Sequence, residues 1–111
     1  MAKSNKGGYV VVLVTCGSRR EAERIAHAIV SRRLAACVNI FAAPVRSVYR
    51  WKGKIERARE FLLVIKSSRK RLVALRREIE RMHSYDVPEF MVLPIVAGSP
   101  RYLAWLDDCL R

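Results

Sequence analysis

The sequence has few cysteines, and their spacing excludes two structures that cysteines often build in small proteins. Cys16, Cys37 and Cys109 are its three cysteines, and no two of them form a C-x-x-C motif. An odd count without local spacing argues against a disulfide framework and against a zinc knuckle. Free cysteines of this kind are typical of a reducing compartment, so we expect a cytoplasmic protein.

Long apolar runs are also missing. The start of the chain, MAKSNKGG, is polar, and no later run reaches the roughly 20 apolar residues that span a bilayer. We therefore expect a protein that crosses no membrane. Residues 1–8 are predicted to form a disordered tail, and residues 9–111 a single globular domain with a modest core.

Acidic and amide side chains are scarce. Gln is absent, Asn occurs twice, and 22 Lys and Arg face 10 Asp and Glu, which gives a formal net charge of +12. Such a charge permits attraction to nucleic acid or other anions. Few amides and many arginines are also typical of thermophile proteins, in which arginine serves solvated ion-pair networks. We favour the ion-pair interpretation, because the basic residues are scattered over the predicted helices and hairpin.

Three apolar or alternating segments predict strands. Residues 9–16 (YVVVLVTC) are nearly all apolar and β-branched, which is typical of a central strand. Residues 35–41 alternate between two faces. Residues 90–97 (FMVLPIVA) are apolar and contain Pro94, which favours an edge strand or a bulge.

Capping residues and amphipathic stretches between and after these segments predict three helices. Ser18 and Glu21 form a capping box before an amphipathic stretch that ends near Arg33. Ser67 or Ser68 is predicted to cap a second helix. The buried stripe of that helix comprises Leu72, Leu75, Ile79 and Met82. A third, short helix is predicted at residues 101–110, after Gly98-Ser99-Pro100.

Residues 45–66 (VRSVYRWKGKIERAREFLLVIK) predict a long hairpin that turns at Lys52-Gly53-Lys54. A three-residue turn would set Arg50 opposite Glu56, whereas pairing two residues tighter would oppose it to Lys54, so cross-strand charge favours the first register. The second arm exceeds the usual strand of about five or six residues. Its exposed edge is therefore expected to pair with another subunit.

The predicted order of elements is β-α-β-β-α-β, followed by a C-terminal helix. This order is that of the split βαβ, ferredoxin-like arrangement, in which two helices cover one face of an antiparallel sheet. The fold class is therefore predicted to be α+β, a ferredoxin-like sandwich with an extended hairpin and a C-terminal helix.

His83 is the strongest candidate for chemistry. It ends the second predicted helix and begins a connector that also carries Tyr85, Asp86 and Glu89. An imidazole beside a carboxylate can bind a divalent metal or move a proton. The alternative is a histidine that caps the helix and is favoured by the helix dipole. Among the cysteines, Cys16 at the end of the first strand is well placed to meet a ligand.

Five blocks in order make the sequence similar to one family, the CutA divalent-cation-tolerance proteins. They are LAACVNI at residues 34–40, S-x-Y-x-W-x-GKIE at 47–56, EFLLVIK at 60–66, H-x-Y-x-x-PE at 83–89 and YL-x-WL at 102–106. The similarity extends from about Val10 to Arg111.

The resemblance implies a cytosolic, ferredoxin-like homotrimer in which hairpin strands pair between subunits. It also implies a role in tolerance of copper and other divalent cations, without an established enzymatic activity. Five positions match family residues that gather in a cleft between subunits: Trp51, Glu60, Lys66, Tyr85 and Glu89. Cys16 is shifted from the place where some relatives carry a cysteine.

Cys37 and His83 match family positions suggested for metal contact. Neutral imidazole and thiolate suit copper better than magnesium or calcium, so copper(II) is the expected ion. We expect His83 to matter more than Cys37, in a weak and partly exposed site. A basic nucleic-acid-binding module stays open as the alternative function, and a hydrolytic or transferase activity at the cleft as a third.

Overall fold

A computed structural model of the chain describes residues 3–4 and 8–111, so most of the predicted tail at residues 1–8 lies outside the described residues. The strands are β1 (Lys3–Ser4), β2 (Tyr9–Cys16), β3 (Cys37–Ile40), β4 (Val45–Trp51), β5 (Lys54–Ser68), β6 (Met91–Pro94) and β7 (Ala97–Gly98). The helices are α1 (Arg19–Ser31), the 3-10 turn η1 (Arg69–Arg71), α2 (Leu72–Met82) and α3 (Pro100–Cys109).

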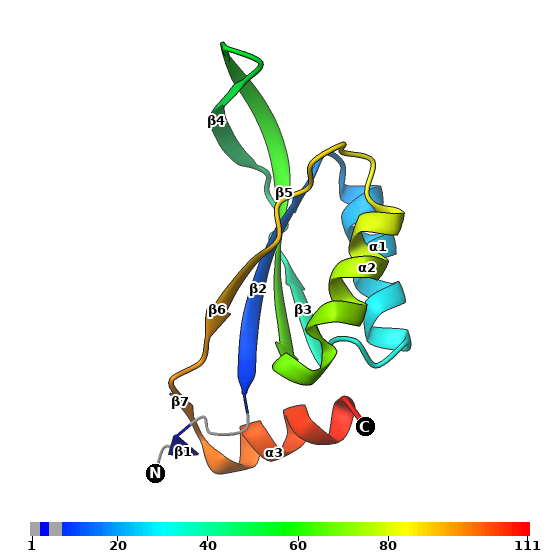
Figure 1. Cartoon of the computed structure of the whole chain (residues 1–111), viewed down its shortest axis with the longest axis vertical. Helices are drawn as coiled ribbons and strands as arrows, with labels where there is room; N and C mark the ends of the chain where they lie inside the picture. Colours follow the sequence, from blue (N-terminus) through cyan, green and yellow to red (C-terminus); the bar gives the residue numbers. More distant parts are fainter. Residues whose placement is uncertain (1–2, 5–7) are drawn as a thin grey trace.

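The main sheet is antiparallel and has the order β3-β5-β2-β6, with β4 paired to the other part of β5. Helices α1 and α2 lie on the same face of this sheet (Figure 1). This arrangement confirms the predicted α+β, ferredoxin-like fold. The central position of β2 and the edge position of β6, where Pro94 pairs with Val10, were both predicted correctly.

The core lies between the sheet and the two helices. Alternate residues of β2 point toward the helices, because successive side chains of a strand point to opposite faces. The fully buried side chains of this layer include Val10, Val12, Val14, Ile25, Ile29, Leu63, Ile65, Leu75 and Ile79. The predicted stripe on α2 is confirmed, since its four apolar residues belong to this core or pack against it.

The helix caps agree with the sequence at α1 and α3 but not at α2. Ser18 Oγ accepts from the Glu21 N–H at 3.1 Å, and Ser99 Oγ accepts from the Tyr102 N–H at 3.4 Å. The predicted serine cap of α2 is wrong. Strand β5 runs on through Ser68, and Ser67 Oγ instead donates to the Leu34 carbonyl at 2.7 Å. Helix α2 therefore begins after η1, without a side-chain cap.

The β4–β5 hairpin projects beyond the body of the molecule, which measures 46 × 25 × 25 Å (Figure 1). Both registers considered from the sequence are wrong. The turn has two residues, Lys52 at φ 49° and Gly53 at φ 79°, so that Trp51 pairs with Lys54 and Arg46 with Arg59. Turns with two positive φ angles match the twist of the flanking strands, and this preference outweighs the cross-strand charges.

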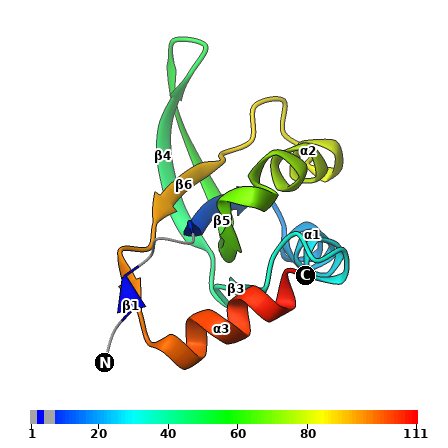
Figure 2. The same cartoon turned by 60° about the horizontal axis from the view of Figure 1, so that its bottom comes forward.

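Helix α3 lies across the end of the sheet beside β3 (Figure 2). Leu106 and Leu110 are buried there against Ala36, with Tyr9 and Cys109 packed at the margin. The predicted packing role of Cys109 is consistent with this position. The sheet face opposite α1 and α2 is partly exposed. The large exposed side chains on that face include Met91 and Leu93 of the edge strand β6.

Candidate functional site

The imidazole of His83 is buried, and both of its nitrogens have partners. His83 caps the C-terminus of α2, where its N–H donates to the Ile79 carbonyl at 2.9 Å. Its Nε2 lies 2.8 Å from the Thr15 carbonyl oxygen, and its Nδ1 accepts from the Tyr85 N–H at 3.1 Å. This geometry assigns the proton to Nε2. The expectation of a partly exposed histidine site is therefore wrong, because His83 is only 8% exposed.

Cys16, Glu21 and His83 form a buried cluster, which we call the Cys-Glu-His cluster. One potential ligand atom from each lies within 4.8 Å of the other two. The residues come from the end of β2, the first turn of α1 and the end of α2, all at one edge of the fold. Among the described residues, this is the group of three potential ligand side chains close enough together to hold a metal ion.

The carboxylate of Glu21 is only half satisfied. Its Oε2 accepts from the Ser84 N–H at 2.9 Å, whereas its Oε1 is buried and has no hydrogen-bond partner among the described residues. Oε1 lies 3.9 Å from His83 Nδ1. An unpaired buried oxygen costs free energy, about 1 to 3 kcal/mol or more for a charged group, which a bound cation would recover. In a capping box the glutamate side chain would accept from the backbone N–H of Ser18, whereas here the Glu21 carboxylate accepts from the Ser84 N–H instead.

The thiol of Cys16 is fully buried, and burial raises its pKa to about 12, with the nearby charges of Glu21 and Glu60 adding to the effect. The thiol is therefore protonated near neutral pH. A metal ion bound here would have to displace that proton. Thiolate, imidazole and carboxylate together form a ligand set that suits zinc or copper rather than magnesium or calcium.

Tyr85 connects the cluster to an open cleft. Its hydroxyl donates to Glu60 Oε2 at 2.9 Å, and its ring lies 4.7 Å from the His83 ring. Burial raises the pKa of Tyr85 most, and the hydrogen bond to Glu60 and that residue's charge raise it further. Tyr85 therefore remains a neutral donor. Gly17 makes room for it, because a Cβ at Gly17 would lie 3.1 Å from the hydroxyl oxygen.

The cleft has a volume of about 680 Å³ and carries only acidic charge. It is lined by Thr15, Ser47, Val48, Tyr49, Trp51, Glu60, Tyr85, Asp86, Val87 and Glu89. Glu60 is 8% exposed, and its carboxylate accepts from the Tyr85 hydroxyl. Burial raises the pKa of Glu89, and the charge of Glu60 adds to this rise. A negative cleft in so basic a chain favours a cationic occupant.

The structure brings together four of the five predicted cleft residues. Trp51, Glu60, Tyr85 and Glu89 line one cavity within a single chain. Lys66 does not, because its Nζ hydrogen-bonds Asn39 and lies 3.9 Å from Cys37 Sγ. Cys37 and Lys66 are direct partners in the β3–β5 ladder. A cleft containing all five residues would thus need Lys66 from another copy.

Cys37 and His83 do not meet within the chain. Cys37 lies beside Lys66, which pairs with Val11, whereas His83 contacts Thr15 at the far end of the same strand. Four residues of a strand separate these points by about 13 Å. Sequence reasoning missed Glu21, which it assigned to helix capping alone. The available signal was topological, since the end of β2 and the end of α2 share one edge in this fold.

Comparisons with known proteins identify similar chains. The profile described as CutA1 divalent ion tolerance protein matches residues 10–109. The chain is 43% identical over 102 residues to the chloroplastic protein CutA of Arabidopsis thaliana, covering 92% of this chain but only 56% of that relative. The chain therefore spans little more than half the length of this relative.

Two solved structures resemble the fold closely. That of the periplasmic divalent cation tolerance protein CutA from Archaeoglobus fulgidus has a TM-score of 0.89 at 39% identity, covering 93% of this chain and 99% of that one. That of the divalent cation tolerance protein from Thermus thermophilus has a TM-score of 0.86 at 42% identity, covering 88% of this chain and 94% of that one. These names state no enzymatic activity.

The names of these relatives refer to the chloroplast and the periplasm, so the cytoplasmic location stays a prediction. None of the helices in the described part of the chain combines the length and apolar character needed to span a bilayer.

Proposed function

Because the chain belongs to the CutA1 divalent ion tolerance family, we propose that it binds divalent cations at the Cys-Glu-His cluster and works as a homotrimer. One observation carries the metal proposal. Glu21 Oε1 is a buried oxygen without a hydrogen-bond partner in residues 8–111, and it faces the imidazole of His83 and the thiol of Cys16. A cation at this point would satisfy it.

Copper is the ion we expect to bind most tightly. Affinity for first-row divalent ions generally peaks at copper, and zinc follows closely for imidazole and thiolate ligands. Binding requires His83 Nδ1 to exchange the Tyr85 N–H for the metal, and Cys16 to lose its proton. Both requirements weaken the site. This proposal keeps the predicted role of His83 and replaces Cys37 with Cys16 as its partner.

The test is titration of the purified protein with copper(II) and zinc(II) by calorimetry near neutral pH. We expect His83→Ala and Cys16→Ser each to weaken binding about tenfold or more. Cys37→Ser is the matched control, since it removes the same group at the other end of the sheet, and should stay within about twofold of wild type. Loss in the Cys37 variant alone would overturn the assignment, and unchanged binding in all three variants would reduce copper to adventitious surface binding.

The homotrimer is supported by three features of the single chain. Strand β5 has 15 residues, and the other edge of β4 has no strand partner among the described residues. The sheet face opposite the helices is apolar and partly open. Lys66 lies apart from the other four predicted cleft residues, and a neighbouring copy could supply its own Lys66 to their cleft. A monomeric mass by light scattering at micromolar concentration would contradict the trimer.

For the cleft we propose binding rather than catalysis. The raised pKa of Tyr85 keeps its proton in place, so the hydroxyl is a donor and not a base or nucleophile. Burial and the charge of Glu60 raise the pKa of Glu89, which makes this carboxyl the candidate acid or base of the hydrolytic alternative. Turnover of a phosphate or carboxylate ester that Glu89→Gln abolishes would instead support the hydrolytic alternative.

A further inference from the structure

The register of the hairpin gathers arginines on one of its faces. With Arg46 opposite Arg59 and Val48 opposite Arg57, one face of the hairpin carries four arginines and two apolar residues, and of these six only Val48 also borders the acidic cleft. We call this set the arginine face, and it comprises Arg46, Val48, Arg50, Ile55, Arg57 and Arg59. The glutamates of the hairpin lie on the other face, where Glu56 is opposite Tyr49 and Glu60 is opposite Val45.

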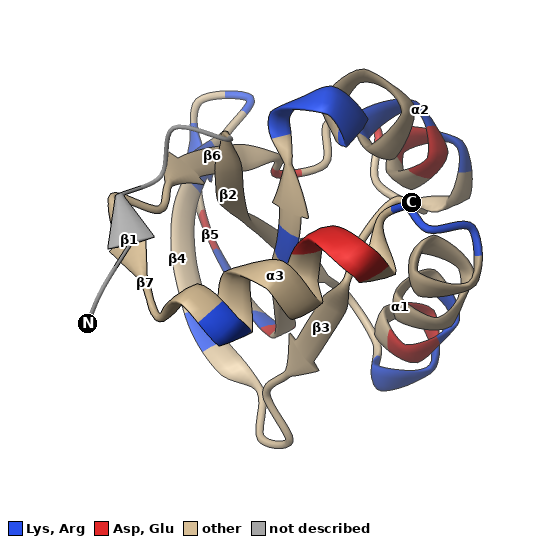
Figure 3. Cartoon of the chain, turned by 90° about the horizontal axis from the view of Figure 1, so that it is seen from below, with Lys and Arg blue, Asp and Glu red and all other residues tan. Residues whose placement is uncertain are grey.

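These arginines are not explained by ion pairs. Arg46, Arg57 and Arg59 make no ion pair with any residue from 8 to 111, and Arg50 donates only to the Gly53 carbonyl at 3.4 Å. Ion pairs do occur on the helices, where acidic and basic residues mix (Figure 3). The ion-pair interpretation of the net charge therefore applies to the helices and fails for the hairpin, where basic residues are clustered and not scattered.

The arrangement is unfavourable for the isolated chain. Arg46 and Arg59 are directly opposite in the ladder, and like charges in such a pair destabilise a sheet by up to about 1 kcal/mol. Two large apolar side chains are also exposed on this face, Val48 at 68% and Ile55 at 58%. A face that combines unpaired like charges with exposed apolar groups is well suited to bind an anion that neutralises the charges.

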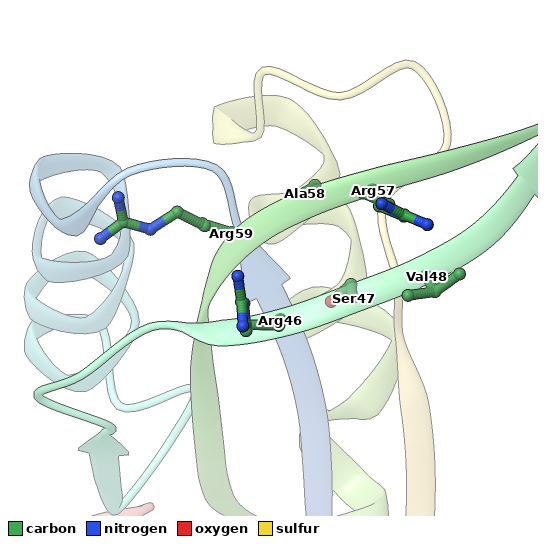
Figure 4. Close-up of a pocket in the computed structure, with 6 residues that line it drawn as sticks. All are labelled: Arg46, Ser47, Val48, Arg57, Ala58 and Arg59. Atoms are coloured by element: carbon green, nitrogen blue, oxygen red, sulfur yellow. The ribbon is translucent and has the colours of Figure 1, made fainter.

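A cavity of about 670 Å³ lies along this part of the hairpin. It is lined by Arg46, Ser47, Val48, Arg57, Ala58 and Arg59, so every charged group in its lining is a guanidinium (Figure 4). A volume of this size is in the range of small-molecule sites. Farther along β5, Arg19 lies over the ring of Phe61 at 5.7 Å and adds a cation beside this end of the hairpin.

We propose that the arginine face binds a small anion that carries several phosphate groups. Guanidinium groups bind phosphate oxygens in a bidentate manner. The Cβ atoms of the cross-strand pair Arg46 and Arg59 are about 5 Å apart, and Arg57 lies two residues before Arg59, about 7 Å away along β5. A chain of linked phosphates can meet all three at once, whereas a single phosphate can meet only the pair.

Nucleic acid fits the surface less well. The arginine face extends over only five residues of β4, about 13 Å from Arg46 to Arg50. A two-stranded ribbon in a major groove is flanked by phosphates on both sides. The other face of this ribbon carries Glu56 and Glu60 and borders the acidic cleft, so it would repel a phosphate backbone. The proposal is independent of the metal site, which lies in the body of the fold.

The test is calorimetric titration of the full chain with inorganic tripolyphosphate at low salt, in buffer freed of divalent metals. We expect Arg46→Gln combined with Arg59→Gln to weaken binding about tenfold or more. The matched control is Arg76→Gln combined with Arg77→Gln, which removes the same charge from the exposed side of α2 and should stay within about twofold. Orthophosphate should bind wild type about tenfold more weakly than tripolyphosphate.

Three outcomes would overturn the proposal. They are no binding of tripolyphosphate by wild type, equal losses in the two double variants, and tighter binding of a duplex DNA of about 20 base pairs than of tripolyphosphate, with a steep salt dependence. The last result would assign the arginine face to nucleic acid. Circular dichroism and mass of each variant establish that the fold and assembly are intact.

Discussion

His83 illustrates how a residue's role depends on contacts that its own neighbourhood in sequence does not contain. Its position at the end of a helix and before an acidic connector was visible in the sequence, and both facts are correct. Its burial, its bond to the Thr15 carbonyl and its proximity to Cys16 come from a strand 68 positions away. The same imidazole is thus a satisfied core group in the metal-free chain and a candidate ligand once a cation offers a better partner.

The buried thiol predicts a loss of stability at alkaline pH. Because the pKa of Cys16 is raised to about 12 in the folded chain, the unfolded chain ionises first as pH rises. The stabilising contribution is complete below the ordinary thiol pKa and falls by up to about 1.4 kcal/mol per pH unit above it. In metal-free urea unfolding, wild type should lose about 1 to 2 kcal/mol more than Cys16→Ala between about pH 8 and about pH 10. Equal losses would show that the thiol ionises freely in the folded chain.

Tyr85 should be important for stability through its hydroxyl. Tyr85→Phe leaves the buried Glu60 carboxylate without this donor, so we expect a loss of about 1 to 3 kcal/mol in the free energy of unfolding. Tyr102→Phe is the control, because Tyr102 is 44% exposed and Tyr85 donates to a buried carboxylate instead. Urea unfolding near neutral pH measures both. Similar small effects in the two variants would mean that water replaces the Tyr85 hydroxyl at Glu60 without cost.

At the scale of elements, two factors arrange the side chains of the hairpin. Alternation determines which residues of one strand share a face, and register determines which residues of the other strand lie opposite them. Alternation correctly placed Tyr49 and Trp51 on one face of β4 and Arg46 and Arg50 on the other. A change of one residue in the pairing then determines which side chains of β5 join them. The chosen register opposes Arg46 to Arg59 rather than to Glu60, and thereby creates both the acidic cleft and the arginine face.

This register predicts a stabilising substitution. Arg59→Glu would replace a like-charge cross-strand pair with an ion pair, and should raise the free energy of unfolding by up to about 1 kcal/mol per subunit at low salt. Arg57→Glu is the matched control, since its direct partner is Val48, and it should have a smaller effect. Thermal unfolding at low and high salt measures both. A gain in the Arg57 variant that equals the gain in the Arg59 variant would exclude the cross-strand pair as its cause.

At the scale of the whole molecule, the open sheet face predicts the behaviour of the proposed trimer. Leu93 is 47% exposed and pairs with Val11 on the face opposite the helices. If a neighbouring copy covers this face, Leu93→Lys buries an unpaired charge and should dissociate the assembly. Val73→Lys is the control, because Val73 is 58% exposed on α2. Light scattering should report a lower mass for the Leu93 variant only. An unchanged mass in both variants would place the interface elsewhere.

The sequence by itself determined the elements of this protein, their order and their family. Periodicity of two and of 3.6, capping at Ser18 and Ser99, and Pro94 in an edge strand are local signals, and local signals depend on neighbouring residues that the sequence displays directly. They sufficed for a ferredoxin-like fold. Four of the five residues that came with the family resemblance line one cavity, and their role in a cleft between subunits stays a prediction.

Only the tertiary structure decided which distant side chains meet. Glu21 looked like a capping residue until its carboxylate was found against Ser84 and His83. Cys37, which the resemblance offered as a metal contact, lies beside Lys66 and apart from His83 within the chain. The hairpin register likewise depends on backbone twist at Lys52 and Gly53 rather than on side-chain charge. The physical reason is the same in each case. These contacts are set by how elements pack and pair across the fold, and no local pattern in the chain records that placement.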